Sequence, residues 1–228
     1  MANLVAATIF FLASHLGLAA TPLRVGLVGR IGEPAYRGLY SLLALAGLVW
    51  MVLAYNAADR IVLWDAGSGG RHVAFLLVLV AFYLLVAGLT VPNPTLAGAE
   101  GTLDRDDAAQ GIVKVTRHPL MWGIGLWALA HLLGNGHLAG LVFFGALGVL
   151  ALLGSFLLDV RKARAGGEAW ARFAAGTSWL PFLALLRRRT GFGLADFGWW
   201  RPLLALAFYF VFLLWGHGWL IGVPLVAR

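Results

Sequence analysis

The fold is decided by residues 118–158, which read HPLMWGIGLWALAHLLGNGHLAGLVFFGALGVLALLGSFLL. No Asp, Glu, Lys or Arg occurs in this stretch. About 20 apolar residues at 1.5 Å each cross a hydrocarbon core of roughly 30 Å, so the stretch is too long for one span. Gly134-Asn135-Gly136 supplies a turn near its middle. The stretch therefore predicts an antiparallel hairpin of two transmembrane helices, about residues 118–133 and 137–158.

The rest of the chain has the same apolar character. Of its 228 residues, 61% are hydrophobic and 12% are charged, and its mean hydropathy is +0.85. A soluble domain normally has about a quarter charged residues. Further apolar runs predict helices at about residues 3–21, 39–57, 72–91 and 202–223. We therefore expect an all-α integral membrane protein, a single domain over residues 1–228 with a bundle of about six transmembrane helices.

Two apolar segments of the chain differ from the other predicted spans. Residues 173–200 begin with a short apolar run that contains Pro181, which predicts an interfacial segment and no further span. The first apolar run ends in Ala19-Ala20, which resembles a signal-peptide cleavage site. No basic residue precedes that run, so we expect a retained transmembrane helix.

The basic residues predict the topology. Three alternate loops, after the first, third and fifth predicted helices, hold 14 of the 17 Lys and Arg residues. The positive-inside rule then places these loops in the cytoplasm and both termini on the outer side. Because topology explains the net charge of +7, no nucleic-acid partner is expected. Membrane lipid is the expected partner, and the pattern specifies no oligomeric state.

Two histidines lie deep in predicted helices, His15 in the first and His131 in the fourth. Either imidazole can serve as an interhelical hydrogen-bonding group, but neutral imidazole is also the commonest metal ligand and an axial ligand of haem iron. The chain has no Cys and three Met, which makes bis-histidine ligation the simplest haem arrangement. Trp127 lies one turn before His131 on the same face. At 1.5 Å per residue, His15 lies about 9 Å and His131 about 20 Å from the cytoplasmic ends of their helices.

The other histidines are weaker candidates. His217 lies near the outer aromatic belt, where an interfacial role competes with iron ligation. His72 and His137 open predicted helices at the outer surface and are expected to be solvated. The glycines and alanines around His15 leave room for a flat cofactor or, alternatively, allow close helix packing.

A polar motif, Thr116-Arg117-His118-Pro119, opens the fourth predicted helix on the cytoplasmic side. Free amides in the first turn and the Arg117 guanidinium form a candidate anion site for a haem propionate or another cofactor carboxylate. Arg117 and His118 are therefore candidate cofactor-binding residues. The alternative is that Arg117 is only a positive-inside anchor.

These motifs together resemble the NnrU family, which is related to the haem-dependent ζ-carotene isomerases. The resemblance covers nearly the whole chain and rests on four motifs: Ser14-His15-Leu16-Gly17; Asn93-Pro94; Thr116-Arg117-His118-Pro119 with Gly123 and Ala130-His131; and Thr177-Ser178-Trp179-Leu180-Pro181-Phe182. It implies haem b in a bacterial inner membrane, with both termini periplasmic on the topology above. It also implies that His15 and His131 match the proposed iron ligands of the isomerases, in which haem serves redox-gated cis–trans isomerisation of a conjugated double bond.

One position departs from the isomerases. They have a cysteine three residues before the second histidine, proposed as an alternative ligand, where this chain has Ala128. Ligand exchange through that cysteine is therefore excluded here.

A more distant resemblance is to the isoprenylcysteine carboxyl methyltransferases. It rests on Arg117-His118-Pro119, Asp159-Val160-Arg161-Lys162 and Glu168-Ala169-Trp170, and it implies S-adenosylmethionine as the alternative cofactor. The paired glutamates of that group are missing after the fifth predicted helix.

Four functions are therefore open. The first is a haem b protein that isomerises an apolar, carotenoid-like small molecule, and the second is a factor linked to denitrification. A membrane methyltransferase and a non-enzymatic assembly factor for respiratory complexes are the alternatives. No residue is assigned a catalytic role.

Overall fold

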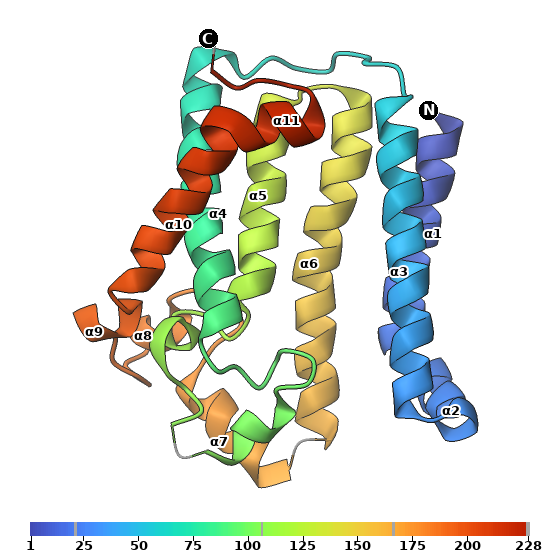
Figure 1. The fold of residues 1–228 in the computed structure, drawn as a ribbon. Coiled ribbons are helices and arrows are strands. Elements are labelled where there is room, and N and C mark those ends of the chain that lie inside the picture. The colour runs from blue at the N-terminus through green and yellow to red at the C-terminus, as the bar shows by residue number, and fades with distance from the viewer. Residues whose placement is uncertain (21, 106, 166, 227–228) are drawn as a thin grey trace. The chain divides into compact units, whose positions relative to one another are not determined.

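The computed structural model describes residues 1–20, 22–105, 107–165 and 167–226, and the elements of this part of the chain are helices joined by loops (Figure 1). The chain divides into two compact units. Unit 1 comprises Met1–Ala74 and Ala128–Arg161, and unit 2 comprises Phe75–Trp127 and Lys162–Arg228. The all-α class expected from the apolar runs is confirmed.

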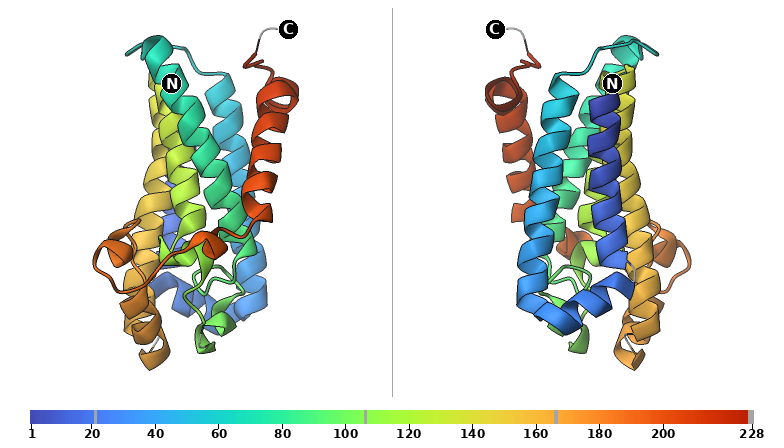
Figure 2. Two further views of the ribbon diagram at one scale, coloured as in Figure 1. Left: turned by 90° about the vertical axis from the view of Figure 1, so that its left-hand side faces the viewer. Right: turned by 90° about the vertical axis from the view of Figure 1, so that its right-hand side faces the viewer.

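Unit 1 contains an antiparallel helix pair, α1 (Ala2–Ala20) and α3 (Glu33–Asn56), which run side by side in Figures 1 and 2. Trp50 Nε1 donates to Asn3 Oδ1 at one end (3.0 Å), and the Tyr36 hydroxyl donates to the Leu18 carbonyl at the other (2.8 Å). A Cβ on Gly47 would come within 3.2 Å of the Phe10 ring. The small residue thus lets the two helices approach closely, as is common between membrane helices.

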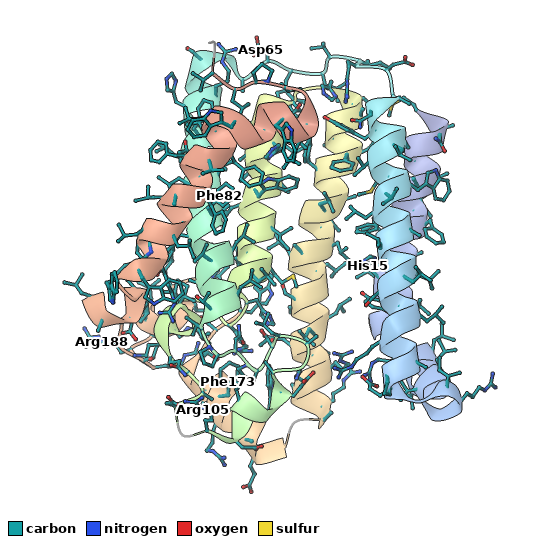
Figure 3. All side chains as sticks on the ribbon, viewed as in Figure 1. His15, Asp65, Phe82, Arg105, Phe173 and Arg188 are labelled. Atoms are coloured by element: carbon teal, nitrogen blue, oxygen red, sulfur yellow. The ribbon has the colours of Figure 1, made fainter. Side chains whose placement is uncertain are left out.

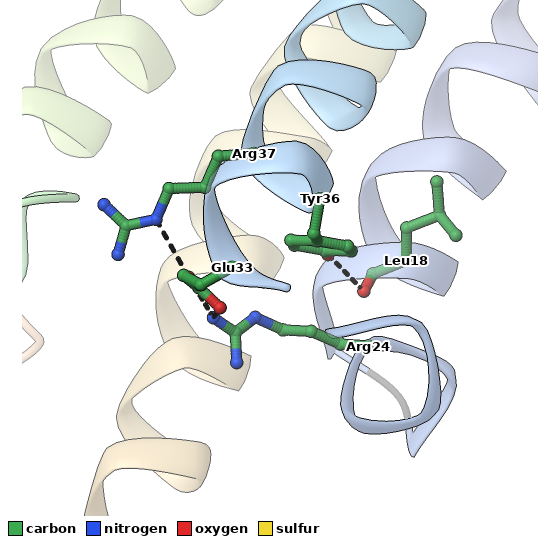
Figure 4. Close-up of polar contacts among 5 residues, drawn as sticks. All are labelled: Leu18, Arg24, Glu33, Tyr36 and Arg37. Atoms are coloured by element: carbon green, nitrogen blue, oxygen red, sulfur yellow. Dashed lines mark hydrogen bonds and ion pairs between the residues drawn. The ribbon is translucent and has the colours of Figure 1, made fainter. Parts of the chain in front are cut away.

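The connection from α1 to α3 contains a short helix, α2 (Pro22–Ile31), and an ion-pair cluster (Figure 4). The Glu33 carboxylate accepts from Arg24 at 2.7 and 2.9 Å and from Arg37 at 2.8 Å. The two arginines and Glu33 are partly solvated, and such exposed pairs contribute little stability each. Their role is to fix the start of α3, beside the left-handed Gly32 (φ 78°).

The opposite end of unit 1 holds the hairpin turn. α5 (Pro119–Gly134) ends there and α6 (Leu138–Ala165) begins, so the predicted Gly134-Asn135-Gly136 turn is confirmed. Residues 57–66, here called the strap, cover this turn. Gly136 O accepts from Leu63 N and Trp64 N at 2.8 and 3.0 Å, and Ile61 O accepts from Leu138 N at 2.8 Å. A Cβ on Gly136 would overlap the Trp64 carbonyl.

Unit 2 contains most of α4 (Gly67–Thr90) and the first part of α5. Its remaining elements are η1 (Glu100–Asp104), η2 (Gly111–Lys114), α7 (Gly167–Gly176), α8 (Leu183–Leu186), α9 (Leu194–Phe197), α10 (Trp200–Val211), the π-helical turn η3 (Phe212–Gly216) and α11 (His217–Ile221). Phe82 of α4 contacts Tyr209 and Phe212 (ring centroids 6.4 and 5.6 Å; Figure 3).

The core of unit 2 lies at the end of α4. Val91, Val113 and Trp170 are buried there together with Phe173 and Leu84. This core joins the loop after α4, η2 and α7, so the polar segments between the apolar helices are packed against one another.

Four helices in the described part of the chain are long and apolar enough to span a membrane: Glu33–Asn56, Gly67–Thr90, Leu138–Ala165 and Trp200–Ile221. A fifth span results if Ala2–Leu18 and Leu23–Ile31, bent by 74°, are counted as one. α5 is apolar but has only 16 residues, because Pro119 begins it and Gly134 ends it. The multi-pass membrane class is confirmed, and the count of six is not.

Two segments differ in detail from the expectation. α6 continues to Ala165, seven residues beyond the predicted end at Leu158. Its last two turns are charged, so they form helix although they do not belong to the apolar run. Residues 173–200 hold the end of α7 and the short helices α8 and α9, so this region contains no span among its described residues.

Candidate functional site

His15 lies on α1 with a defined ring orientation. Its Nδ1 is 2.8 Å from the Phe11 carbonyl oxygen, and its ring lies 4.1 Å from the Phe11 ring and 5.6 Å from the Tyr40 ring. A carbonyl oxygen only accepts hydrogen bonds, so Nδ1 carries the proton. The lone pair is then on Nε2, which is the arrangement of most metal-binding histidines.

The surroundings of His15 suit an additional group. Thr8, two turns before His15 on the same face of α1, is 8% exposed, and among the described residues its Oγ1 is the buried side-chain atom without a hydrogen-bond partner. Buried hydroxyls are normally paired. The His15 imidazole with a free Nε2 and the unpaired Thr8 hydroxyl on the same helix face form a donor set that is compatible with haem.

His131 lies on α5 near the hairpin turn. Its ring contacts the Phe144 ring at 4.8 Å, and Phe144 packs against Phe143 and Tyr55 at 5.0 and 5.6 Å. Trp127, one turn earlier on α5, is half-buried. His131 is thus in an aromatic cluster at the strap end of unit 1.

The two histidines lie at different depths in unit 1. His15 contacts Tyr40, near the start of α3, whereas the cluster around His131 contacts Tyr55, one residue before α3 ends. Tyr40 and Tyr55 are 15 residues apart, a rise of about 22 Å along a helix. The contacts therefore do not place the two imidazoles opposite each other, and the predicted pair is not brought to one iron position in this structure.

Arg117 forms the centre of a second cluster, in unit 2. Only 8% of the residue is exposed. Its Nε donates to Thr177 Oγ1 at 3.0 Å, and its Nη2 donates to the carbonyls of Ala174 and Thr177, both at 3.2 Å. The guanidinium also lies 5.4 Å from the Trp170 ring and 5.9 Å from the Phe173 ring, within the range of cation–π attraction.

The backbone of Arg117 joins three segments. Its N–H donates to Ser178 O at 2.8 Å, and its carbonyl accepts from Asn93 Nδ2 and Thr95 Oγ1 at 3.1 and 3.2 Å. Asn93 is fully buried. We call Asn93, Thr95, Arg117, Thr177 and Ser178 the polar node.

Neighbouring residues extend the polar node. Trp179 O accepts from Thr116 Oγ1 and Trp122 Nε1, both at 2.9 Å, and Lys162 Nζ donates to Pro94 O at 3.1 Å. His118 is 2% exposed. The predicted anion site is therefore densely occupied by the protein's own donors and acceptors.

The remaining histidines are at the ends of helices. His72 is exposed, as expected, with Nδ1 2.7 Å from Ser68 O. His217 Nδ1 is 2.7 Å from Val223 O. His137 is half-buried where solvation was expected: it stacks on Tyr55 at 6.1 Å, and its Nδ1 accepts from Gly140 N–H at 2.8 Å. His137 thus caps α6.

No group of three or more His, Cys, Asp or Glu side chains that could hold a metal ion occurs within the described ranges. Sequence reasoning identified the motifs that contain Asn93 and Thr177 but did not pair them with Arg117. It also missed Tyr40 and Thr8. Arg117 and Thr177 are 60 positions apart in the sequence, and no local pattern predicts their contact.

Comparisons with known proteins give one family and two similar curated proteins. Residues 3–225 match the family described as NnrU protein. The chain is 28% identical over 195 residues to the chloroplastic 15-cis-zeta-carotene isomerase of Zea mays, covering 80% of this chain and 50% of that protein. It is 30% identical over 195 residues to the same-named protein of Arabidopsis thaliana, covering 79% and 49%. The chain thus spans about half the length of these curated relatives. No solved structure gives a significant match.

Proposed function

The chain belongs to the NnrU family, and on this premise we propose that it is a haem b-binding membrane protein that isomerises a cis double bond in a conjugated, apolar molecule. The similarity to 15-cis-zeta-carotene isomerases over about four fifths of the chain supports the isomerase class. The exposed apolar helix faces require a lipid phase. A carotenoid-like substrate dissolves in that same phase.

The observation that carries the proposal is the contact between His15 Nδ1 and the Phe11 carbonyl, from which the tautomer is inferred. With Nδ1–H held by Phe11 O at 2.8 Å, the Nε2 lone pair is available as an axial ligand. Bound haem would supply an iron centre whose oxidation state gates the isomerisation. His15 would hold and orient that group, and Thr8 on the same helix face has an unpaired hydroxyl for it.

The second axial ligand is a separate question. His131 was predicted for this role, but its aromatic cluster lies at the Tyr55 end of α3, whereas His15 lies at the Tyr40 end. We therefore propose His15 as the protein ligand of the iron. The test below determines whether His131 is the second ligand. Ligation by both requires a movement of α5 or α1 that brings the rings to one depth.

The test is an absorption spectrum of the full chain purified in detergent after expression with ample haem. We expect a Soret band, and His15→Ala should remove it or shift it. An unchanged spectrum in His131→Ala supports single-histidine ligation, whereas a low-spin to high-spin change identifies His131 as the second ligand. A wild-type protein without haem would overturn the proposal and favour the methyltransferase alternative, which binding of S-adenosylmethionine then tests.

Substrate turnover needs its own assay. Reduced haem-loaded protein mixed with a 15-cis polyene should form the trans isomer, and His15→Ala should not. A haem protein that leaves every tested polyene unchanged would favour a non-enzymatic role linked to respiration or denitrification.

We further propose that the chain lies in a bacterial inner membrane with both termini in the periplasm. Support comes from the 14 of 17 basic residues in three alternate loops. A reporter fused after Arg228 should be active only outside the cytoplasm, and cytoplasmic activity would contradict the topology.

A further inference from the structure

Residues 180–200 of unit 2, here called the arginine corner, expose large apolar side chains. Leu186 is 79% exposed, Leu194 is 89% exposed and Trp199 is 80% exposed. These residues lie in and around α8 and α9, which are too short to span a membrane. Single exposed apolar residues are ordinary. Three large ones within 14 residues indicate a surface that contacts another molecule or the membrane.

The same segment is strongly basic. Arg187, Arg188 and Arg189 follow α8 and are exposed, and within the described residues none of them forms an ion pair. The only carboxylate of the segment is Asp196. It is 2.8 Å from Lys114 Nζ and accepts from Gly193 N at 2.9 Å. The arginine corner therefore has three uncompensated positive charges next to apolar side chains.

The arginine corner has a defined backbone. Phe182 and Arg188 have left-handed backbones, with φ 65° and 54°, which non-glycine residues adopt only when their surroundings hold them. Phe182 N donates to Val115 O at 2.8 Å, and Ala184 N donates to Ser178 Oγ at 3.0 Å. Figure 3 shows Arg188 beside α8 and α9. The segment that carries the arginines and the apolar side chains is thus attached to the polar node at Ala184 and to Lys114 at Asp196.

We propose that the arginine corner binds anionic phospholipid headgroups, with Leu186, Leu194 and Trp199 inserted into the adjoining acyl region. Charge complementarity selects an anionic headgroup, because guanidinium groups bind phosphate in bidentate fashion. The surface also continues directly into α10, whose Leu203 and Phe210 are 58% and 49% exposed and suit contact with lipid chains. Arginine and tryptophan beside leucine are the residues with which interfacial segments bind anionic membranes.

The experiment is native mass spectrometry of the full chain in detergent with phosphatidylglycerol or phosphatidylcholine of identical acyl chains. We expect the wild-type chain to retain phosphatidylglycerol selectively. R187Q/R189Q, which leaves the left-handed Arg188 unchanged, should lower the apparent affinity for phosphatidylglycerol on the order of tenfold and leave phosphatidylcholine binding unaltered. Size-exclusion profiles and thermal stability establish that the variant is folded.

R164Q/R172Q is the matched control, because it removes two exposed arginines of unit 2 that lie outside the arginine corner. This control variant should keep most of the wild-type selectivity for phosphatidylglycerol over phosphatidylcholine. Equal losses in the two variants would overturn the proposal in favour of a general charge effect, and so would wild-type binding without headgroup preference. Competition by free glycerophosphoglycerol as strong as by the lipid would also overturn it, because a soluble phosphate compound would then be the occupant. These outcomes do not depend on haem content.

Discussion

The two polar regions of this protein are built in opposite ways. The polar node of unit 2 joins Asn93, Arg117 and Thr177 by direct hydrogen bonds and buries all three. In the described region around His15 in unit 1, the side chains of Ser14 and His15 hydrogen-bond only to the Phe11 carbonyl of their own helix. The rings of His15 and Tyr40 are partly exposed there, and the Thr8 hydroxyl is unpaired. A fully satisfied network serves stability, and we assign that role to the polar node. For the His15 region we propose a bound group. Both regions carry motifs of the same family resemblance, and this proposal gives them different roles.

The largest expected effect is at Arg117. Arg117→Ala leaves the carbonyls of Ala174 and Thr177 and the Thr177 hydroxyl without their donors, so we expect a loss of about 3 kcal/mol or more. Arg117→Lys keeps the charge but lacks the planar fork and should lose roughly 2 kcal/mol. Thermal unfolding in detergent measures both. A lysine variant of wild-type stability that loses its cofactor would mean that Arg117 serves a bound anion.

A second prediction concerns packing in unit 2. A Cβ on Gly88 would lie 2.7 Å from Leu120 N and 3.1 Å from Leu120 Cα. Because backbone atoms cannot yield as a side chain can, Gly88→Ala should destabilise the protein by about 1–3 kcal/mol. Gly38→Ala on α3 is the control, since nothing lies within 4 Å of its Cβ position. Equal stability of the two variants would show that α4 and α5 are not in close contact here.

A smaller effect is expected from pH at the strap end of unit 1. Burial, and then the positive charge of Arg60, lowers the pKa of His137 below 6.5. The neutral ring accepts from Gly140 N–H, and protonation removes that acceptor. The stability that the cap contributes, about 1 kcal/mol, is present above pH 6.5 and is lost as the pH falls through the lowered pKa.

Thermal unfolding between pH 8 and pH 5 tests this sign. His137→Asn should weaken the pH dependence, because an Asn side chain caps helices without titrating in this range. A variant with the full acid loss of the wild type would assign the effect to another group.

The smallest effect on stability is expected at His15. The Phe11 carbonyl that His15 contacts is within a regular helix, so His15→Ala should change the free energy of unfolding of the haem-free protein by less than about 1 kcal/mol. A large loss would place His15 among the structural residues and remove the contrast between the two regions.

The sequence predicted the elements better than their contacts. Each predicted apolar run falls on a helix, and the Gly134-Asn135-Gly136 turn was also predicted, because the length and polarity of a run are local properties. The extension of α6 to Ala165 and the short helix α2 escaped this method, which detects apolarity and not helicity. His15 was found because a polar group in an apolar helix is conspicuous. The partners of Arg117 were not found, since Asn93, Arg117 and Thr177 come together only through the fold.

Haem content measured side by side in His15→Ala and Arg117→Lys tests the central claim most directly. The pyridine haemochrome assay gives moles of haem per mole of folded protein, with size-exclusion peaks securing the folded fraction. We predict that His15→Ala remains folded and loses haem, whereas folded Arg117→Lys retains haem at a lower melting temperature. Retention of haem by folded His15→Ala, with its loss from folded Arg117→Lys, would contradict the account and move the cofactor to the polar node.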